Sequence, residues 1–450
     1  MKVYFYTLGC RVNQYETDAV RKLCENSGMT SVDLPEEADV VVINTCSVTG
    51  EADRKSRQQI RHMRKVNPKA IICAMGCQVE AAEGKVEADI ILGTRDKKLL
   101  PDRINEFCNS EEYITRTTTG FCMHKRPEVS KEDVYQEFGT VQSPEGTRAF
   151  VKIEDGCNNF CTYCIIPYTR GRVVSREEEN VVKEVMELAS EGFAEVVLTG
   201  IHLCSYGKDR GEGTEALLRL LQKINAIDGI ERIRLGSLEP MSLTPEFIAG
   251  LKSVNKLCPH FHLSLQSGSD TVLKRMNRKY NSSEYEARVN ALREVYPDMS
   301  LTTDVICGFP GETEEEFNET YEFVNRLKFS KLHVFPYSVR EGTVAAKMEQ
   351  VPKSISKART AVLNDFSSKA EDEFARRFVG RKVRVLVEAN RSAEAEKLTG
   401  DSCVFYTGYT EEYVKVVIKF KDEAEAQKYV GKVIEGNLIE FLTLYAIEEF

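Results

Sequence analysis

The 450-residue sequence has no run of about 18 apolar residues, and no basic segment followed by an apolar stretch near its beginning. We therefore expect no membrane span and no export signal, and we expect a cytoplasmic location. The chain also lacks an excess of positive charge. Its net charge is −9, so any binding of nucleic acid must rest on local patches. Low-complexity tracts and long solenoid-type repeats are absent too, which leaves an ordinary folded protein of several domains.

Cysteine, in contrast, is plentiful, with 14 residues. In a reducing compartment this number favours metal or redox chemistry over a disulfide framework. Three of these thiols, Cys157, Cys161 and Cys164, lie within the stretch "EDGCNNFCTYCIIP". A zinc site takes four ligands, or three and a water, and commonly begins with paired C-x2-C units, so an iron–sulfur cube fits this spacing better. Three thiolates would leave one iron of the cube open for a small molecule.

The first part of the chain predicts an α/β fold. Residues 1–108 alternate the short strands "KVYFYT", "ADVVVINT", "AIICAM" and "ADIILG" with helices over 14–24 and 50–66. Apolar β-branched strands separated by helices are typical of a doubly wound parallel sheet. Residues 109–145 lack clear periodicity, and we expect them to form a linker.

The remainder predicts a larger and a smaller barrel. Residues 146–378 contain six β/α units, which is typical of a partial (β/α)6 barrel of parallel strands. Residues 379–450 alternate apolar and polar positions, including one long strand over 437–447, as in a small antiparallel β-barrel. Three helices of the second series have the capping-box pattern, at Ser175 with Glu178, Ser283 with Glu286, and Thr313 with Glu316.

A second set of cysteines follows successive strands of the first domain: Cys10, Cys46 and Cys77. Ligands of an open parallel sheet collect outside the carboxyl ends of its strands, so we expect these three thiols to converge and to hold a second cube with an open iron. Cys73 competes with Cys77 but lies within an apolar strand. The other cysteines are expected to pack as small apolar residues; they are residues 24, 73, 108, 122, 204, 258, 307 and 403.

The C-x3-C-x2-C motif after the first strand of the larger barrel resembles the hallmark of radical S-adenosylmethionine (SAM) enzymes. The resemblance implies a [4Fe–4S] cluster whose free iron binds SAM, and reductive cleavage of SAM to a 5′-deoxyadenosyl radical. Polar or glycine residues at the carboxyl ends of the barrel strands would contact SAM, although each could equally be an ordinary barrel residue. The candidates are Gly200, Ser237, Gln266, Asp304 and Tyr337.

The whole chain resembles the methylthiotransferase family of these enzymes, which joins an N-terminal domain with three cysteines, a radical SAM barrel and a C-terminal TRAM domain. The stretches "PYTRGRVVSR" and "DVICGFPGETEEEF" also match. The resemblance implies two [4Fe–4S] clusters, SAM, and an electron donor such as flavodoxin or ferredoxin. We expect a monomer.

Three branches of this family differ in substrate. "TLGCRVNQYET" and "INTCSVTGEADRKSRQQIR" most resemble the branch that converts N6-threonylcarbamoyladenosine next to the tRNA anticodon to its 2-methylthio derivative. The alternatives are isopentenyl-adenosine in tRNA and an aspartate of a ribosomal protein. A different class of function, a non-catalytic iron–sulfur sensor that binds RNA, needs neither a second open iron nor a SAM site.

A threonylcarbamoyl group carries a carboxylate, which needs a cationic partner because a buried unpaired charge is costly. Arg11, Arg170 and Arg172 lie beside the cysteines and are the candidates. The anticodon stem-loop of tRNA would need basic patches. Those patches are Arg54, Lys55, Arg57, Arg61 and Arg64 on one helix, Arg176 with Arg170 and Arg172, and Lys274, Arg275, Arg278 and Lys279. The terminal barrel itself is acidic, with 10 Lys and Arg against 13 Asp and Glu from residue 381 onward.

Overall fold

The computed structural model describes residues 1–82, 86–111, 134–141, 146–399, 403–441 and 444–448. Most of the expected linker, over 112–133 with Cys122, and residues 142–145 lie outside the described residues. Contacts within the chain define two compact units. Unit 1 comprises residues 1–142, 152–176 and 338–347, and unit 2 comprises residues 143–151, 177–337 and 348–450. No helix in the described ranges is both long and apolar enough to cross a membrane.

Unit 1 is built on a parallel sheet in the order β2-β1-β3-β4-β5, which confirms the predicted doubly wound sheet. Its strands are β1 (Lys2–Thr7), β2 (Thr30–Ser31), β3 (Val40–Thr45), β4 (Ile71–Gly76) and β5 (Ile90–Leu92). The two-residue edge strand β2 is an addition that the sequence did not indicate. In register, β3 places Val40 beside Val3 of β1 and Ile71 of β4.

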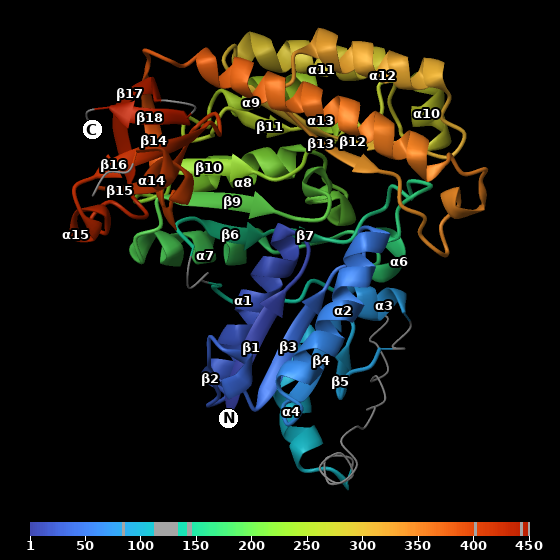
Figure 1. Ribbon diagram of the computed structural model, residues 1–450, viewed down its shortest axis with the longest axis vertical. Helices are drawn as coiled ribbons and strands as arrows, with labels where there is room; N and C mark the ends of the chain where they lie inside the picture. The colour runs from blue at the N-terminus through green and yellow to red at the C-terminus, as the bar shows by residue number, and fades with distance from the viewer. Residues whose placement is uncertain (83–85, 112–133, 142–145, 400–402, 442–443, 449–450) are drawn as a thin grey trace. The chain divides into compact units, whose positions relative to one another are not determined.

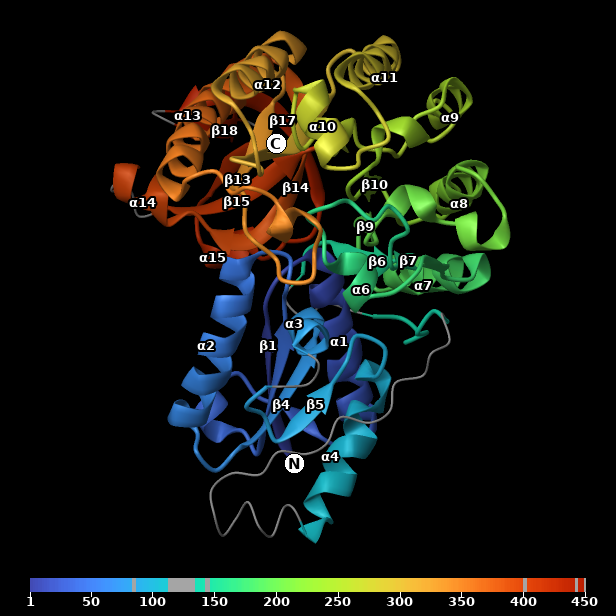
Figure 2. The ribbon, with the colours of Figure 1, turned by 90° about the vertical axis from the view of Figure 1, so that its right-hand side faces the viewer.

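Helices cover both faces of this sheet (Figures 1 and 2). They are α1 (Arg11–Asn26) and α4 (Leu100–Cys108) on one face, and α2 (Gly50–Val66) and α3 (Cys77–Ala81) on the other; short 3-10 turns lie at Pro35–Glu37 and Lys97–Leu99. Val42 packs with Val20 of α1 and Ile104 of α4, whereas its neighbour Ile43 packs with Ile60 of α2. Every residue of β3 and β4 is buried, as expected for strands covered on both faces.

Two later segments of the chain also belong to unit 1. Residues 152–176 contain the antiparallel pair β7 (Glu154–Asp155) and β8 (Val174–Ser175) and the one-turn helix α6 (Ile166–Thr169). Residues 338–347 end in a 3-10 turn, Ala345–Lys347. The Gly50 N–H donates to Ser338 Oγ (2.8 Å), and the Ala345 N–H donates to the Thr162 carbonyl (2.9 Å). The second segment is therefore hydrogen-bonded both to α2 and to the first segment.

Unit 2 contains the six strands of the predicted partial barrel. They are β6 (Ala149–Lys152), β9 (Glu195–Thr199), β10 (Arg232–Leu235), β11 (His260–His262), β12 (Ser300–Cys307) and β13 (Lys331–Pro336). Hydrogen bonds join them as β10-β9-β6 and β11-β12-β13, and the parallel bridges Ile233↔Leu257 and Leu238↔Leu263 lie between the two sheets. The strands thus follow one another in chain order, as the series of β/α units predicts.

Helices surround these strands in an arc (Figure 2). They are α7 (Glu178–Ser190), α8 (Glu215–Asn225), α9 (Pro245–Leu251), α10 (Asp270–Arg275), α11 (Ser282–Val295), α12 (Glu314–Leu327) and α13 (Lys353–Arg376), with 3-10 turns at Leu203–Ser205, Lys208–Arg210 and Pro240–Ser242. The capping box at Thr313 is confirmed. The box at Ser283 is wrong, because Asn281 caps α11, two residues earlier. The box at Ser175 is also wrong, because this residue pairs with Glu154 in β8.

The last part of unit 2 is a closed barrel in the order β14-β15-β16-β18-β17. Its elements are β14 (Lys382–Arg391), α14 (Ala393–Thr399), β15 (Val404–Thr410), β16 (Lys415–Phe420), α15 (Glu423–Ala426), β17 (Val433–Phe441) and β18 (Leu444–Glu448). All strand pairs are antiparallel except β16 with β18. The single strand expected over 437–447 is wrong: it is divided between β17 and β18, and no glycine or proline within 437–447 indicates the division.

Unit 2 buries one carboxylate among three guanidinium groups. Glu195, the first residue of β9, forms ion pairs with Arg232 (2.9 Å), Arg234 (3.1 Å) and Arg148 (3.2 Å). Arg232 and Arg234 also donate to the Thr410 carbonyl of β15 (2.7 and 3.3 Å), which ties the two barrels of this unit together. Burial alone would raise the pKa of Glu195, but the neighbouring guanidinium groups outweigh it and hold the pKa at about 2.

We expect Glu195→Gln to lower the free energy of unfolding at pH 7 by about 3–5 kcal/mol, because it leaves buried guanidinium groups without their counter-charge. The pKa of this carboxyl is depressed in the folded state, so its contribution is present above the ordinary value of 4.5 and is lost as the pH falls toward 2. Urea denaturation from pH 7 downward should show the two proteins converging. Glu187→Gln, which removes an exposed partner of Lys183, is the control and should cost under about 0.5 kcal/mol. An equally small effect at Glu195 would contradict the expectation.

Candidate functional site

The three cysteines of the N-terminal sheet lie just past the carboxyl ends of adjacent strands. Cys10 caps α1 after β1, Cys46 follows β3, and Cys77 begins α3 directly after β4. Since β1, β3 and β4 are neighbours in a parallel sheet, the three residues lie at the same edge. Cys10 is exposed, whereas Cys46 and Cys77 are 4% and 3% exposed.

The thiols at this edge are close to one another. A Cβ atom on Gly9, whose φ is +103°, would lie 2.7 Å from both Cβ and Sγ of Cys46, so only glycine lets the Cys10 loop approach so closely. Burial raises the pKa of Cys46 to about 11, and the charges of Cys77 and Cys10 act in the same direction. Within the described residues, no three Cys, His, Asp or Glu side chains meet as tightly as the ligands of a single metal ion. Thiolates are the ligands that hold iron–sulfur clusters, so three soft donors at one edge of the sheet are chemically suited to such a cluster.

Side-chain amides fix the backbone that carries these thiols. Asn13 donates to the carbonyls of Leu8 (2.7 Å) and Thr45 (3.0 Å), and so joins the loops of Cys10 and Cys46. Asn44 donates in turn to the Asn13 carbonyl (2.9 Å). Both asparagines are buried, so their hydrogen bonds are shielded from competing water. The edge of the sheet is therefore preorganised.

The other three cysteines lie on a loop closed by the pair β7 and β8. At its base, the Cys157 N–H donates to the Gly171 carbonyl (3.1 Å), and within it the Cys164 N–H donates to the Cys161 carbonyl (3.0 Å). A Cβ atom on Gly156, at φ +81°, would lie 2.0 Å from the Arg172 carbonyl oxygen, so the base closes only around glycine. All three thiols are half-buried. The backbone thus holds a compact loop that offers three partly accessible sulfurs.

A buried guanidinium connects this loop to the N-terminal sheet. Arg170 Nε donates to Cys77 Sγ (3.2 Å), and its other nitrogens donate to Glu16 (2.9 Å), Asp155 (3.0 Å) and Asn13 (2.8 Å). The Arg170 side chain has no exposed surface. It is therefore fully engaged within unit 1. Substrate binding, which the sequence suggested for Arg170, would require this network to open.

Two lysines complete the network. Lys152 contacts Glu16 (2.7 Å) and Asp155 (2.5 Å), and Lys97 pairs with the other oxygen of Glu16. Burial alone would raise the pKa of Glu16, but the three surrounding cations hold it well below its usual range. Burial lowers the pKa of Lys97, while contact with Glu16 favours the ammonium form. Burial raises the pKa of Cys77, and Arg170 and Lys97 oppose that rise.

Sequence reasoning missed this network, yet α1 contains a signal for it. Glu16 lies four residues from both Val12 and Val20 and so falls on the apolar face of the helix. A carboxylate on such a face must be paired. The partners come from distant parts of the chain, and no local pattern identifies them.

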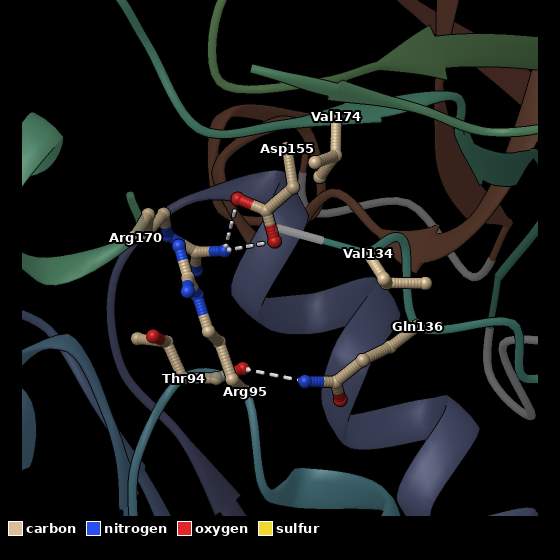
Figure 3. Close-up of a pocket in the computed structure, with 7 residues that line it drawn as sticks. All are labelled: Thr94, Arg95, Val134, Gln136, Asp155, Arg170 and Val174. Carbon is tan, nitrogen blue, oxygen red and sulfur yellow. Dashed lines mark hydrogen bonds and ion pairs between the residues drawn. The ribbon is translucent and has the colours of Figure 1, made fainter. Parts of the chain in front are cut away.

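A small cavity of about 20 Å³ adjoins the network (Figure 3). This volume suffices for about one water molecule. The Asp155 carboxylate faces the guanidinium of Arg170, and Gln136 donates to the Thr94 carbonyl (3.3 Å). Thr94 also donates to the Thr169 carbonyl (2.7 Å), and thereby holds α6. The cavity is too small for a substrate and belongs to the support of the cysteine loop.

The other two predicted substrate arginines lie near the cysteines. Arg172 is exposed, and its guanidinium stacks over the ring of Phe160 at 4.7 Å. Arg11 is the first residue of α1, next to Cys10, and is half-buried. Cys73, the competitor of Cys77, is 1% exposed in the core of the sheet.

Four of the five candidate SAM residues of unit 2 lie past the carboxyl ends of strands, whereas Asp304 lies in the middle of β12. Gly200 follows β9, Ser237 lies two residues past β10, and Asp304 is within β12. Gln266 has a left-handed φ of +72°, which is uncommon for a residue other than glycine. Tyr337 follows β13, and its hydroxyl is buried with no hydrogen-bond partner among the described residues.

Most residues of the predicted basic patches are already paired. On α2, three arginines contact carboxylates: Arg54 with Glu51, Arg61 with Glu87, and Arg64 with Asp89. In unit 2, Arg275 pairs with Glu316 and Arg278 with Glu239. These pairs reduce the positive charge available to phosphates. Lys55 and Arg57 are exposed on α2.

Comparisons with known proteins define the class. Residues 151–324 match the radical SAM superfamily, whose members use a [4Fe–4S] cluster and SAM, and residues 2–92 match a family described only as uncharacterized protein family UPF0004. The solved radical SAM methyltransferase TsrM from Kitasatospora setae superposes with a TM-score of 0.56 at 15% identity, over 77% of each chain. This likeness concerns the fold alone.

Two curated relatives narrow the class to a family. The threonylcarbamoyladenosine tRNA methylthiotransferase MtaB of Bacillus subtilis (strain 168) is 40% identical over 97% of this chain and 94% of its own. The tRNA-2-methylthio-N(6)-dimethylallyladenosine synthase of Clostridium tetani is 37% identical over 88% of this chain and 87% of its own. The chain belongs to the methylthiotransferase family of radical SAM enzymes.

The burial of the N-terminal thiols predicts an order of alkylation in iron-free protein. We expect iodoacetamide to modify the exposed Cys10 at least tenfold faster than Cys46 or Cys77, since a buried thiol is both inaccessible and poorly ionised. Mass spectrometry of timed samples measures the rates. Cys24 is the matched control, because it is 1% exposed and lies on α1, the helix that Cys10 caps. Equal rates for Cys10 and Cys46 would contradict the described geometry.

Proposed function

We propose that this methylthiotransferase acts on tRNA and converts N6-threonylcarbamoyladenosine, next to the anticodon, to its 2-methylthio derivative. The observation that carries the proposal is the presence of two separate cysteine triads in unit 1, one of them in the radical SAM motif. A sensor would need only one cluster. The choice of substrate follows the name of the Bacillus subtilis relative, which aligns with nearly the whole chain.

The two triads would hold two [4Fe–4S] clusters. Cys157, Cys161 and Cys164 would bind the cluster that holds SAM, and Cys10, Cys46 and Cys77 would bind a second cluster, whose open iron would serve sulfur delivery. With these groups bound, SAM supplies the methyl group and the radical that activates C2 of the purine. The chain contributes two rigid cradles, because backbone hydrogen bonds and glycines fix each set of thiols before any cluster is bound.

Unit 2 would supply the contacts to SAM. The Gly200 backbone would approach the methionine amino group closely, since it has no side chain. Ser237, Gln266 and Asp304 would hydrogen-bond the carboxylate or the ribose. The orphaned hydroxyl of Tyr337 supports this role most directly, because a buried hydroxyl without a partner is costly unless a ligand completes it.

An arginine near the cysteines would bind the threonylcarbamoyl carboxylate. Arg172 suits this task, since Phe160 orients its guanidinium while the side chain stays exposed. Arg11 is the second candidate. Arg170 fits a positioning role better, because two carboxylates already occupy its donors. As further partners we propose the anticodon stem-loop and an electron donor such as flavodoxin or ferredoxin, and we propose a monomer.

The cluster assignment predicts about eight irons per chain after anaerobic reconstitution, since each cube carries four. Replacing Cys157, Cys161 and Cys164 by alanine should leave about four irons and abolish formation of 5′-deoxyadenosine. Replacing Cys10, Cys46 and Cys77 should also leave about four irons, but should spare SAM cleavage and abolish methylthiolation. Iron analysis and chromatography of the products measure these outcomes. A wild-type plateau near four irons would refute the second cluster.

The substrate assignment predicts discrimination between two modified tRNAs. Purified enzyme should methylthiolate tRNA bearing threonylcarbamoyladenosine and leave tRNA bearing isopentenyl-adenosine unchanged, because only the first offers a carboxylate to an arginine. Mass spectrometry of digested nucleosides measures the products. Arg172→Ala should reduce kcat/KM for the first tRNA at least tenfold, and the exposed Lys98→Ala serves as a control. Equal turnover of both tRNAs, or modification of a ribosomal protein instead, would contradict this branch of the family.

A further inference from the structure

The buried network around Arg170 places a cation against one of the N-terminal thiols. Arg170, Lys97 and Lys152 contact the carboxylates of Glu16 and Asp155. Both lysines and the arginine are essentially inaccessible to water. Arg170 also donates from Nε to the sulfur of Cys77, so its positive charge lies directly beside this thiol.

The geometry directs the Nε–H of Arg170 at that sulfur, because other partners hold both terminal nitrogens. Glu16 accepts from both terminal nitrogens of Arg170 (2.9 and 3.1 Å), and Asp155 accepts from one of them with both of its oxygens (3.0 Å each). Asn13 accepts from the second terminal nitrogen (2.8 Å). A planar guanidinium held at both ends cannot rotate, and its Nε–H therefore points to Cys77 Sγ at 3.2 Å.

We propose that Arg170 is a positioning residue for the second cluster, and that its N–H···S hydrogen bond and positive charge raise the reduction potential of that cluster. This inference rests on the proposed binding of a cluster by Cys10, Cys46 and Cys77. Hydrogen bonds to cluster sulfurs and nearby charge are among the factors that set such potentials. Because Arg170 lies six residues past Cys164, the loop of the SAM-binding cluster also supplies the residue that tunes the other cluster.

The test isolates the second cluster in the full-length chain. A background variant with Cys157, Cys161 and Cys164 replaced by alanine keeps the loop, since the bonds that close it are made by backbone groups. In this background Arg170 is changed to Lys or to Gln. Arg170→Lys keeps the positive charge but loses the planar set of N–H donors that directs one of them at Cys77. Arg170→Gln removes the charge, while Lys97 and Lys152 still pair with Glu16 and Asp155.

Each protein is reconstituted anaerobically, and its iron is counted. Dithionite then reduces the [4Fe–4S] cluster by one electron, from the 2+ to the 1+ state. Electron paramagnetic resonance at controlled potentials follows this reduction. We expect about four irons in every variant, and a midpoint potential that becomes more negative from Arg to Lys to Gln. Arg234→Lys is the matched control, because Arg234 is equally buried and is also held by a glutamate, in unit 2. It should leave the potential unchanged.

The outcomes separate this inference from the proposed function. Background protein that binds no iron would refute the second cluster, and the inference with it. Four irons with the same potential and spectrum in all variants would overturn the inference alone and leave Arg170 a purely structural residue. A shift of the same size in Arg234→Lys would also overturn it, since the effect would then not depend on contact with Cys77.

Discussion

The structure of unit 1 depends on the burial of five ionised groups between the cysteine loop and the N-terminal sheet. Removing such groups from water is expensive, and a buried ion pair seldom contributes net stability compared with apolar packing. What it does contribute is specific pairing: Glu16 is compensated by Lys97 of the sheet domain together with Lys152 and Arg170 of the later segment. The loop is thereby fixed to one position on the sheet, and Glu16 and Arg170, which are 154 residues apart in sequence, belong to a single compact unit.

The two ends of the parallel strands have different roles, one in stability and the other in carrying the candidate site residues. In unit 2, Glu195 and Arg232 are the first residues of β9 and β10; they form an ion pair, and Arg232 also donates to the Thr410 carbonyl of the terminal barrel. The candidate ligands for SAM, except Asp304 within β12, lie past the other ends of the strands, as Tyr337 does after β13. Unit 1 follows the same rule, with its cysteines past the carboxyl ends. In both units the amino ends can be packed for stability without constraining the chemistry.

The fold and the cysteines were predictable because both depend on local pattern. Buried β-branched strands between helices identify a parallel sheet, and this topology alone brings Cys10, Cys46 and Cys77 to one edge. Features that depend on tertiary contact were not predictable. The turn between β17 and β18 has no glycine or proline to mark it, and Asn281 caps a helix for which a nearby serine offered the same local signal. The ionic partners of Glu16 come from three separate segments, which no periodicity can connect.

Arg170 and Arg172 illustrate where the sequence reaches its limit. They are two residues apart in "TRGR", with the same charge, six and eight residues past Cys164, and composition cannot distinguish them. Gly171 lies between them at φ +83°, a conformation that turns the backbone sharply. One guanidinium is consequently buried among carboxylates, and the other lies exposed on Phe160. A buried arginine is suited to hold fixed groups, and an exposed one to meet an incoming anion. A single glycine therefore separates the buried arginine that organises the site from the exposed arginine for which contact with a substrate anion is proposed.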